Sequence, residues 1–137
     1  MSMTCVDGKC AIIYVFVKKG CPPCDAMDKE IAKLKANYGG KRNPRGRDGI
    51  HFITVQRNTQ EHIFRMNNVF STPTILIKPA GSPGVVIDYS GPRTAAAIVS
   101  VAMSSSACSK KGKHGECYID GRQQMLWTNP TVIIPSY

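Results

Sequence analysis

The stretch Gly20-Cys21-Pro22-Pro23-Cys24 decides the fold, because it joins an apolar run directly to a segment with helical spacing. The run before it, Ala11–Val17, is apolar throughout and rich in β-branched and aromatic residues. Such a run predicts a central strand that is covered on both faces. After the cysteines, apolar residues recur at intervals of three and four, and two glycines follow, which predicts a helix to about residue 38. The recurring residues are Met27, Ile31, Leu34 and Tyr38.

Two cysteines three positions apart, where a strand meets a helix, suit reversible disulfide chemistry. The first turn of a helix has unpartnered N–H groups and the positive end of the helix dipole. A thiolate at Cys21 should be favoured there, so its pKa should fall. Pro22 suits the first helical position, where its missing N–H costs no hydrogen bond. We therefore predict that Cys21 attacks and that Cys24, one turn further in, resolves; a structural disulfide or half of a zinc site is the alternative.

The chain has the length of one domain, and its charge is strongly positive. Its 137 residues include 18 Lys and Arg against 9 Asp and Glu, which gives a net charge of +9. This excess favours acidic partners, nucleic acid or anionic surfaces. Nucleic acid is the weakest of these, because the positive charge is spread out and no readout motif accompanies it. The basic loop at residues 41–49 is either a docking patch or a solvated connection.

Four further cysteines lie near the two ends of the sequence, at Cys5, Cys10, Cys108 and Cys117. Each neighbouring pair could close a small loop as a disulfide, and the four together could bind zinc if the two ends meet. They could also be reduced thiols, and we predict no metal site. The first nine residues show no secretory signal and no stretch is long enough to span a membrane. We therefore expect a cytoplasmic protein, or one incorporated in an assembly such as a virion.

The remaining segments predict an α/β fold with a four-stranded mixed sheet between helices. Strands are expected at residues 50–56, 75–77 and 85–89, and a last helix at 93–103. Asn58 and Glu61 form a helix-start capping pair, and the short helix after them should carry Ile63, Met66 and Val69. The first two strands should be parallel because a helix joins them, and the last two antiparallel because a short turn joins them.

Three regions follow from this reading: a lead at residues 1–9, the α/β domain at 10–104, and a basic and apolar extension at 105–137. The extension includes Trp127 and an apolar end. It covers its own domain, or it reaches a neighbouring subunit by adding a strand to an exposed edge. Self-association or an assembly contact through residues 104–137 is thus one expectation for this protein.

The order of elements resembles that of the thioredoxin superfamily over roughly residues 10–104. Two motifs carry the resemblance: the Cys21–Cys24 stretch at a strand-to-helix junction, and Thr72-Pro73 just before the third strand. The resemblance implies a three-layer thioredoxin-like fold. It also implies a cis peptide bond between Thr72 and Pro73 beside the cysteines, with the backbone of Thr72 pairing with a substrate polypeptide. Pro22 and Pro23, between the cysteines, are expected at the same substrate-binding surface.

Within that superfamily the sequence shares features with more than one branch. Lys18 matches a lysine that helps glutaredoxins hold the carboxylate of glutathione, so glutathione is a possible ligand. The Gly-Gly-Ser/Cys-Asp element of glutaredoxins is replaced by residues 89–94, which look more like thioredoxin and protein disulfide isomerase domains. Two positions depart from thioredoxins: Val15 replaces a buried acid, and Gly20 replaces the usual aromatic residue.

The function implied by the residues and the resemblance together is thiol–disulfide exchange on protein disulfides. The redox-active disulfide is the only group that this chemistry needs, so no cofactor is expected. An upstream reductase or oxidase would reset the pair, and the motif does not say which. The alternative is a structural or adaptor component of a larger assembly, such as a viral particle, that docks through the basic loop and the C-terminal extension.

Overall fold

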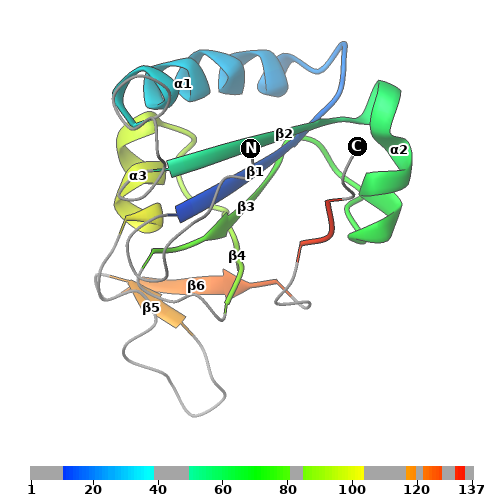
Figure 1. Cartoon of the computed structure of the whole chain (residues 1–137). Helices are drawn as coiled ribbons and strands as arrows, with labels where there is room; N and C mark the ends of the chain where they lie inside the picture. The colour runs from blue at the N-terminus through cyan, green and yellow to red at the C-terminus, as the bar shows by residue number, and fades with distance from the viewer. Residues whose placement is uncertain are drawn as a thin grey trace, which may run out of the picture.

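The computed structural model describes residues 11–38, 50–80, 85–103, 117–119, 122–127 and 132–134. These ranges form one six-stranded sheet with helices on both faces (Figure 1). In chain order, the elements are β1 (Ala11–Val17), α1 (Pro22–Tyr38), β2 (Ile50–Gln56), α2 (Arg57–Met66), β3 (Thr74–Lys78), β4 (Ile87–Asp88), α3 (Ala95–Ala102), β5 (Cys117–Ile119) and β6 (Arg122–Leu126). None of the helices in these ranges has the length and apolar character that crossing a bilayer requires.

The strands lie in the order β2-β1-β3-β4-β6-β5. β1 and β2 are parallel over their whole length, from Ala11 beside Ile50 to Val17 beside Gln56. β3 is antiparallel to β1, and β4 is antiparallel to β3. These directions confirm the predicted mixed sheet. The apolar run of β1 is likewise confirmed as a central strand, since nearly all its side chains are buried.

The predicted strand number was wrong, because two strands come from the region that we expected to be an extension. β6 pairs antiparallel with β4, with Leu126 beside Ile87, and β5 pairs antiparallel with β6. β6 reads Arg-Gln-Gln-Met-Leu, which has no β-branched or aromatic residue, so its own composition does not indicate a strand. The register places Ile119 beside Arg122 and leaves Asp-Gly between them in the sequence, which is a strong hairpin signal that we did not weigh.

Each face of the sheet carries its own hydrophobic core. Alternate residues of β1 point to opposite faces, as in any strand. One set packs with α1 and α3, and that cluster includes Ile13, Val15, Leu34 and Ile98. The other set, Tyr14 and Phe16, packs with α2. The cysteines belong to the α1/α3 face, so this face is the one that positions the site.

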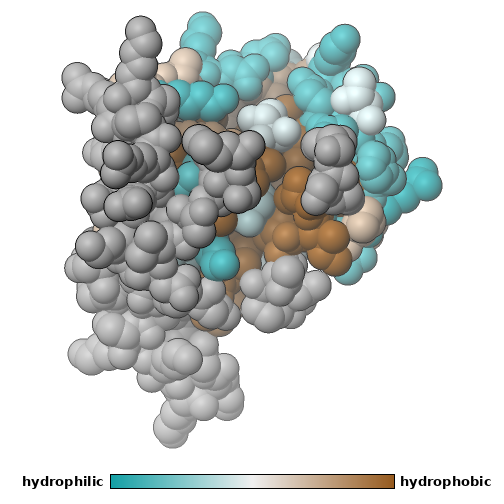
Figure 2. Space-filling view, viewed as in Figure 1, coloured by the Kyte–Doolittle hydropathy of each residue, from teal (hydrophilic) through white to brown (hydrophobic). Residues whose placement is uncertain are grey.

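The end of the chain covers its own domain on the α2 face. Trp127, Val132 and Ile134 pack against the core of that face, and the backbone N–H of Trp127 donates to the carbonyl of Val86 at 2.8 Å. In Figure 1 the segment 132–134 (red) runs beside α2, and in the same view Figure 2 shows a hydrophobic area there. Trp127 and the segment 132–134 are therefore part of the packed domain.

Asn67 fastens this segment, although it is a polar residue with only 4% of its surface exposed. Its side-chain Nδ2 donates to the carbonyls of Ile63 and Ile133, both at 2.8 Å. Its Oδ1 accepts from the backbone N–H of Ile133 at 2.6 Å. One amide thus satisfies the end of α2 and pairs with the backbone of residue 133 much as a neighbouring strand would.

Asn67→Ala should lower the free energy of unfolding by about 1–3 kcal/mol, because the backbone N–H and carbonyl of Ile133 lose their side-chain partner and the carbonyl of Ile63 loses one of its two donors. Urea unfolding measures this loss. Trp127 is the only tryptophan of the chain, so its emission should shift to the red if the segment detaches. Asn58→Ala is the matched control, since Asn58 accepts one exposed hydrogen bond. Equal stability and emission for Asn67→Ala and the wild type would contradict a clamping role.

Several predicted boundaries differ from the structure near the ends of elements. α2 begins at Arg57, directly after β2, so Asn58 and Glu61 are not its capping pair. Instead, the backbone N–H of Gln56 donates to Oε1 of Gln60, at 3.0 Å. Met66 is 44% exposed rather than buried, and Val69, although buried, lies beyond the helix. β4 and α3 are shorter than predicted; α3 starts later because Thr94 caps it by accepting from the N–H of Ala97.

Candidate active site

Three loops meet at one end of the sheet, and the strand directions explain why. β1 ends at Val17, and β3 begins beside that end, with Thr74 opposite Phe16. β4 is antiparallel to β3, so it runs with β1 and finishes at the same end. The loops at residues 18–21, 71–73 and 89–93 are therefore neighbours, although they are far apart in the sequence.

Cys21 and Cys24 form a disulfide at the head of α1, with their Cα atoms 5.2 Å apart. Cys21 is the residue before the helix, and its carbonyl accepts the first helical hydrogen bond, from the N–H of Asp25 at 3.1 Å. Pro22 occupies the first helical position, as predicted. The backbone N–H of Cys24 points at the sulfur of Cys21, with N to Sγ at 3.3 Å. This donor would stabilise negative charge on Cys21 once the disulfide is reduced.

Both cysteines are buried in the disulfide form. Cys21 is 5% exposed and Cys24 is 2% exposed, and both belong to the core cluster of the α1/α3 face. The expectation that Cys24 is the more covered thiol stays a prediction. Pro22 and Pro23, between them, are exposed, so they form part of the surface around the disulfide.

The loop before Cys21 takes its shape from Gly20 and from a contact with α2. Gly20 has φ +71°, a left-handed conformation that residues with a side chain rarely adopt. An aromatic residue, the usual one at this position in the resembled family, would be strained on this backbone. The N–H of Lys19 donates to Oδ1 of Asn58 at 2.9 Å, so the residue predicted to cap α2 anchors this loop instead. Lys18 is exposed in the same loop.

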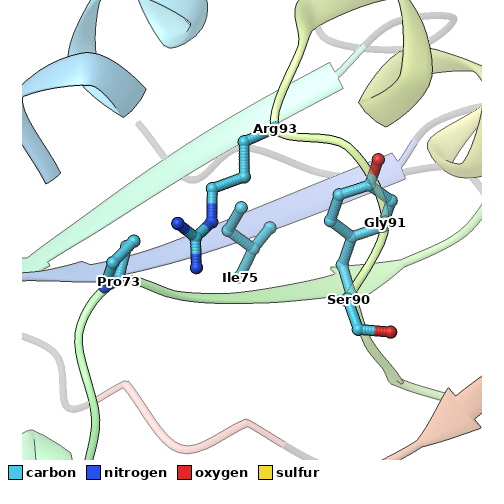
Figure 3. A pocket seen from close by; sticks show the side chains of 6 residues that line it. Pro73, Ile75, Ser90, Gly91 and Arg93 are labelled. Atoms are coloured by element: carbon cyan, nitrogen blue, oxygen red, sulfur yellow. The ribbon is translucent and has the colours of Figure 1, made fainter. Parts of the chain in front are cut away.

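Thr72-Pro73 has the cis peptide bond that the resemblance implied. The turn before β3 is fixed by side-chain bonds, since Oγ1 of Thr74 donates to the carbonyl of Ser71 at 2.7 Å and lies 3.2 Å from its hydroxyl. Pro73 borders a cavity of about 380 Å³ between this loop and the loop at residues 89–93. Figure 3 shows this cavity from close by.

Tyr89 and Gly91 hold the third loop in place. The hydroxyl of Tyr89 donates to the carbonyl of Pro92, and burial raises the pKa of this phenol. A Cβ on residue 91 would lie 2.9 Å from the hydroxyl oxygen of Tyr89, so only glycine allows this close approach. Tyr89 and Ile75 pack in the same core cluster as Cys21 and Cys24. The loop is thus rigidly joined to the part of the core that contains the disulfide.

Glu30 links the cysteine-bearing helix to α3. Its Oε1 accepts from the backbone N–H of Ala95 at 2.8 Å, and its Oε2 lies 2.9 Å from Nζ of Lys33. The bond from Lys33 and then the bond from Ala95 lower the pKa of the Glu30 carboxyl. The carboxylate also faces the positive end of the α3 dipole. Nothing in the sequence indicated this role, because the two partners are 65 residues apart.

The structure brings together most of the residues that we predicted at the site. Five of them lie at the start of α1 or in the loop before it: Lys18, Cys21, Pro22, Pro23 and Cys24. The adjacent loop contains Thr72 and Pro73. Their roles in binding and catalysis stay predictions. Cys5, Cys10, Cys108 and the basic loop lie outside the described residues, as does the side chain of Cys117. Among the residues that are described, no three His, Cys, Asp or Glu side chains are grouped to hold a metal ion.

A sequence model of the thioredoxin family matches residues 5–104, which is well over half of the chain. The protein belongs to the thioredoxin family. This match of the family model confirms the resemblance drawn from the two motifs. A search of curated protein sequences found no significant match to this thioredoxin-family protein.

Solved structures similar to this thioredoxin-family protein have low sequence identity to it. A malarial protein is 23% identical, with a TM-score of 0.49, over 66% of this chain and 91% of that one. The first thioredoxin domain of mouse protein disulfide-isomerase A4 is 23% identical, with a TM-score of 0.47, over 67% and 60% of the two chains. The J-Trx1 fragment of ERdj5 is 21% identical, with a TM-score of 0.50, over 69% and 40%. The chain therefore spans 60% of the second of these structures and 40% of the third.

The fold and the disulfide together support a general conclusion about activity. A thioredoxin-family domain with a Cys-X-X-Cys pair bonded at the head of a helix is the arrangement of a thiol–disulfide oxidoreductase. Such a pair stores two electrons as two thiols and gives them up when the disulfide forms.

Proposed function

We propose that this protein exchanges disulfide bonds with other proteins through Cys21 and Cys24. In the reducing direction, the Cys21 thiolate attacks one sulfur of a substrate disulfide and forms a mixed disulfide, and the other substrate sulfur leaves as a thiolate. The Cys24 thiolate then attacks the sulfur of Cys21. This step forms the Cys21–Cys24 disulfide and releases the second substrate thiolate, so the substrate gains two electrons and the protein loses two.

The observation that carries the proposal is the hydrogen bond from the N–H of Cys24 to the sulfur of Cys21 at the start of α1. The Sγ of Cys21 therefore has a backbone donor and the positive end of the helix dipole beside it. Cys21 is followed by Pro22, which is exposed. The proximity of the Ser71–Pro73 turn supports a polypeptide as substrate, because a backbone segment beside the disulfide offers hydrogen-bonding groups to an extended chain.

A partner must reset the pair after each exchange. For the reducing direction this is a dithiol reductase or a small thiol, and for the oxidising direction an oxidase. An equilibrium with glutathione of known ratio would give the reduction potential, and hence the direction.

The decisive test is reduction of insulin by dithiothreitol, followed by the turbidity of the released chains. The wild type should accelerate the reaction, and Cys21→Ser should give only the rate of dithiothreitol alone, because a serine hydroxyl is not ionised at neutral pH. The double variant Cys108→Ser/Cys117→Ser is the control, since it removes two thiols outside the motif. A wild type that is inert although both thiols react with a labelling reagent would refute the proposal and favour the adaptor function.

A further inference from the structure

The cavity between the loops at residues 71–73 and 89–93 contains the cationic side chain of Arg93. The cavity measures about 380 Å³ and is lined by Pro73, Ile75, Tyr89, Ser90, Gly91 and Arg93. Pro73 belongs to the loop that lies next to the end of β1, where the chain leads to Cys21. A polypeptide joined to Cys21 that runs along this loop would therefore pass close to the cavity.

The guanidinium of Arg93 reaches into the cavity from the loop before α3. In Figure 3 its side chain extends across Ile75 toward Pro73, away from the ribbon that carries Ser90 and Gly91. The loop that carries it is held by the bond from Tyr89 to Pro92 and, beyond it, by Thr94 at the start of α3. The backbone at Arg93 is therefore held, and its exposed side chain is open to a ligand.

No carboxylate of the described residues neutralises Arg93. The ion pairs in this part of the protein lie within α1 and α2, and none includes Arg93. Asp88 is the nearest acidic residue in the sequence. It lies between Ile87 and Tyr89, which both pack on the α1/α3 face, so the alternation of the strand directs Asp88 to the other face. An unpaired guanidinium in a cavity is a site that an external anion can fill.

We propose that Arg93 binds an Asp or Glu side chain of the substrate protein, a few residues from the disulfide that is attacked, so that the protein prefers acidic substrates. The inference rests on the proposed function, because it needs a polypeptide bound at Cys21. A guanidinium pairs with a carboxylate through two parallel hydrogen bonds, which suits recognition of a carboxylate. The net charge of +9 favours the approach of the same acidic partners.

The test uses two families of disulfide-bonded peptides that carry a fluorescence donor and quencher. In one family a glutamate stands at each of the three positions on either side of the cysteine in turn, and in the other a glutamine. For at least one position, the wild type should show a kcat/KM about fivefold higher for the glutamate peptide, which corresponds to ~1 kcal/mol, the size of an accessible ion pair. The preference should shrink as salt is added.

Substitutions at two arginines separate a local effect from one of overall charge. Arg93→Gln should react with the glutamate and glutamine peptides at rates within twofold of each other. Arg93→Glu should favour a peptide that carries lysine at that position. Arg65→Gln is the matched control, because it removes the same charge from an exposed residue on α2 and should keep the preference for glutamate.

The outcomes distinguish this inference from the proposed function. If the wild type reduces both families at equal rates at every position, the proposed role of Arg93 is wrong and the exchange activity stands. If neither family reacts, the proposed function fails as well. Oxidised glutathione is the last substrate to compare. If Arg93→Gln lowers kcat/KM for oxidised glutathione as much as for the glutamate peptide, the cavity binds the carboxylate of a small thiol. That result would overturn the assignment of Arg93 to a protein side chain.

Discussion

Cys24→Ser should stop turnover and trap the protein as a mixed disulfide with its substrate. The first step, attack by Cys21, needs only the thiolate at the head of α1. Its stabilising donor is the backbone N–H at position 24, which a serine retains. The substitution therefore leaves the attacking group in its environment and removes only the thiol that releases the product.

The expected loss is large because the second step is intramolecular. The two Cα atoms are 5.2 Å apart, so the thiol of Cys24 is already at the sulfur that it must attack. Oriented neighbouring groups reach effective concentrations that exceed any external thiol by orders of magnitude. With millimolar dithiothreitol as the only resolving thiol, the rate of multiple turnover should fall at least about a thousandfold.

The measurement is a non-reducing gel and mass spectrometry of the reaction with a disulfide-bonded peptide. Cys24→Ser should carry one peptide on Cys21, and a reductant should remove it. Cys21→Ser is the reference that should form little adduct, because Cys24 lacks the helix-start N–H donor that Cys21 has. Adduct on Cys24 of the Cys21→Ser variant, with none on Cys21 of the other, would mean that the roles are reversed.

The parts of the fold that could be predicted are those in which local pattern and tertiary position agree. Ala11–Val17 is apolar at every position and lies in the middle of the sheet. Pro22 begins α1 because its ring fits the first helical turn. The two motifs lie at neighbouring loops because strand directions bring them there. Each of these outcomes follows from a short stretch of sequence and a general rule.

The parts that could not be predicted depend on partners that are distant in the sequence. Asn67 and Ile133 are 66 residues apart, and Glu30 and Ala95 are 65 apart. An asparagine after a helix, or a glutamate within one, is ordinary on a solvated surface, so neither stands out before the chain is folded. β6 was missed for a related reason: its polar residues form a strand because β4 offers an open edge. Its one local signal was the Asp-Gly that precedes it.

The residues of the candidate site also separate into those that could be predicted from the sequence and those that could not. The cysteines were found because their spacing has a chemical meaning, and Thr72 and Pro73 were found because their motif resembles that of the thioredoxin superfamily. Arg93 belongs to residues 89–94, which were compared with glutaredoxins, thioredoxins and protein disulfide isomerase domains without giving this arginine a role of its own. Its relevance comes from the cavity and from the absence of an acidic partner among the described residues, and both are properties of the assembled loops.

Phe16→Ala should be the most destabilising substitution of a single core residue among those considered for this protein. Phe16 is fully buried in the cluster of the α2 face. Its ring meets that of Phe64 edge to face, with centroids 5.1 Å apart and planes at 88°. Truncation of a buried phenylalanine costs about 3–5 kcal/mol, through lost burial and the cavity that remains. This is a large part of the ~5–15 kcal/mol that stabilises a typical domain.

Urea unfolding followed by circular dichroism and by Trp127 emission measures the loss. Phe70→Ala is the matched control: it makes the same chemical change at a side chain that is 76% exposed, and it should cost less than about 0.5 kcal/mol. Phe16 lies opposite Thr74, at the end of the sheet where β1 leads to Cys21. Loosening of this end should therefore slow insulin reduction even at temperatures where the variant is still folded. Equal losses for the two variants would contradict the assignment of Phe16 to a packed core beside the site.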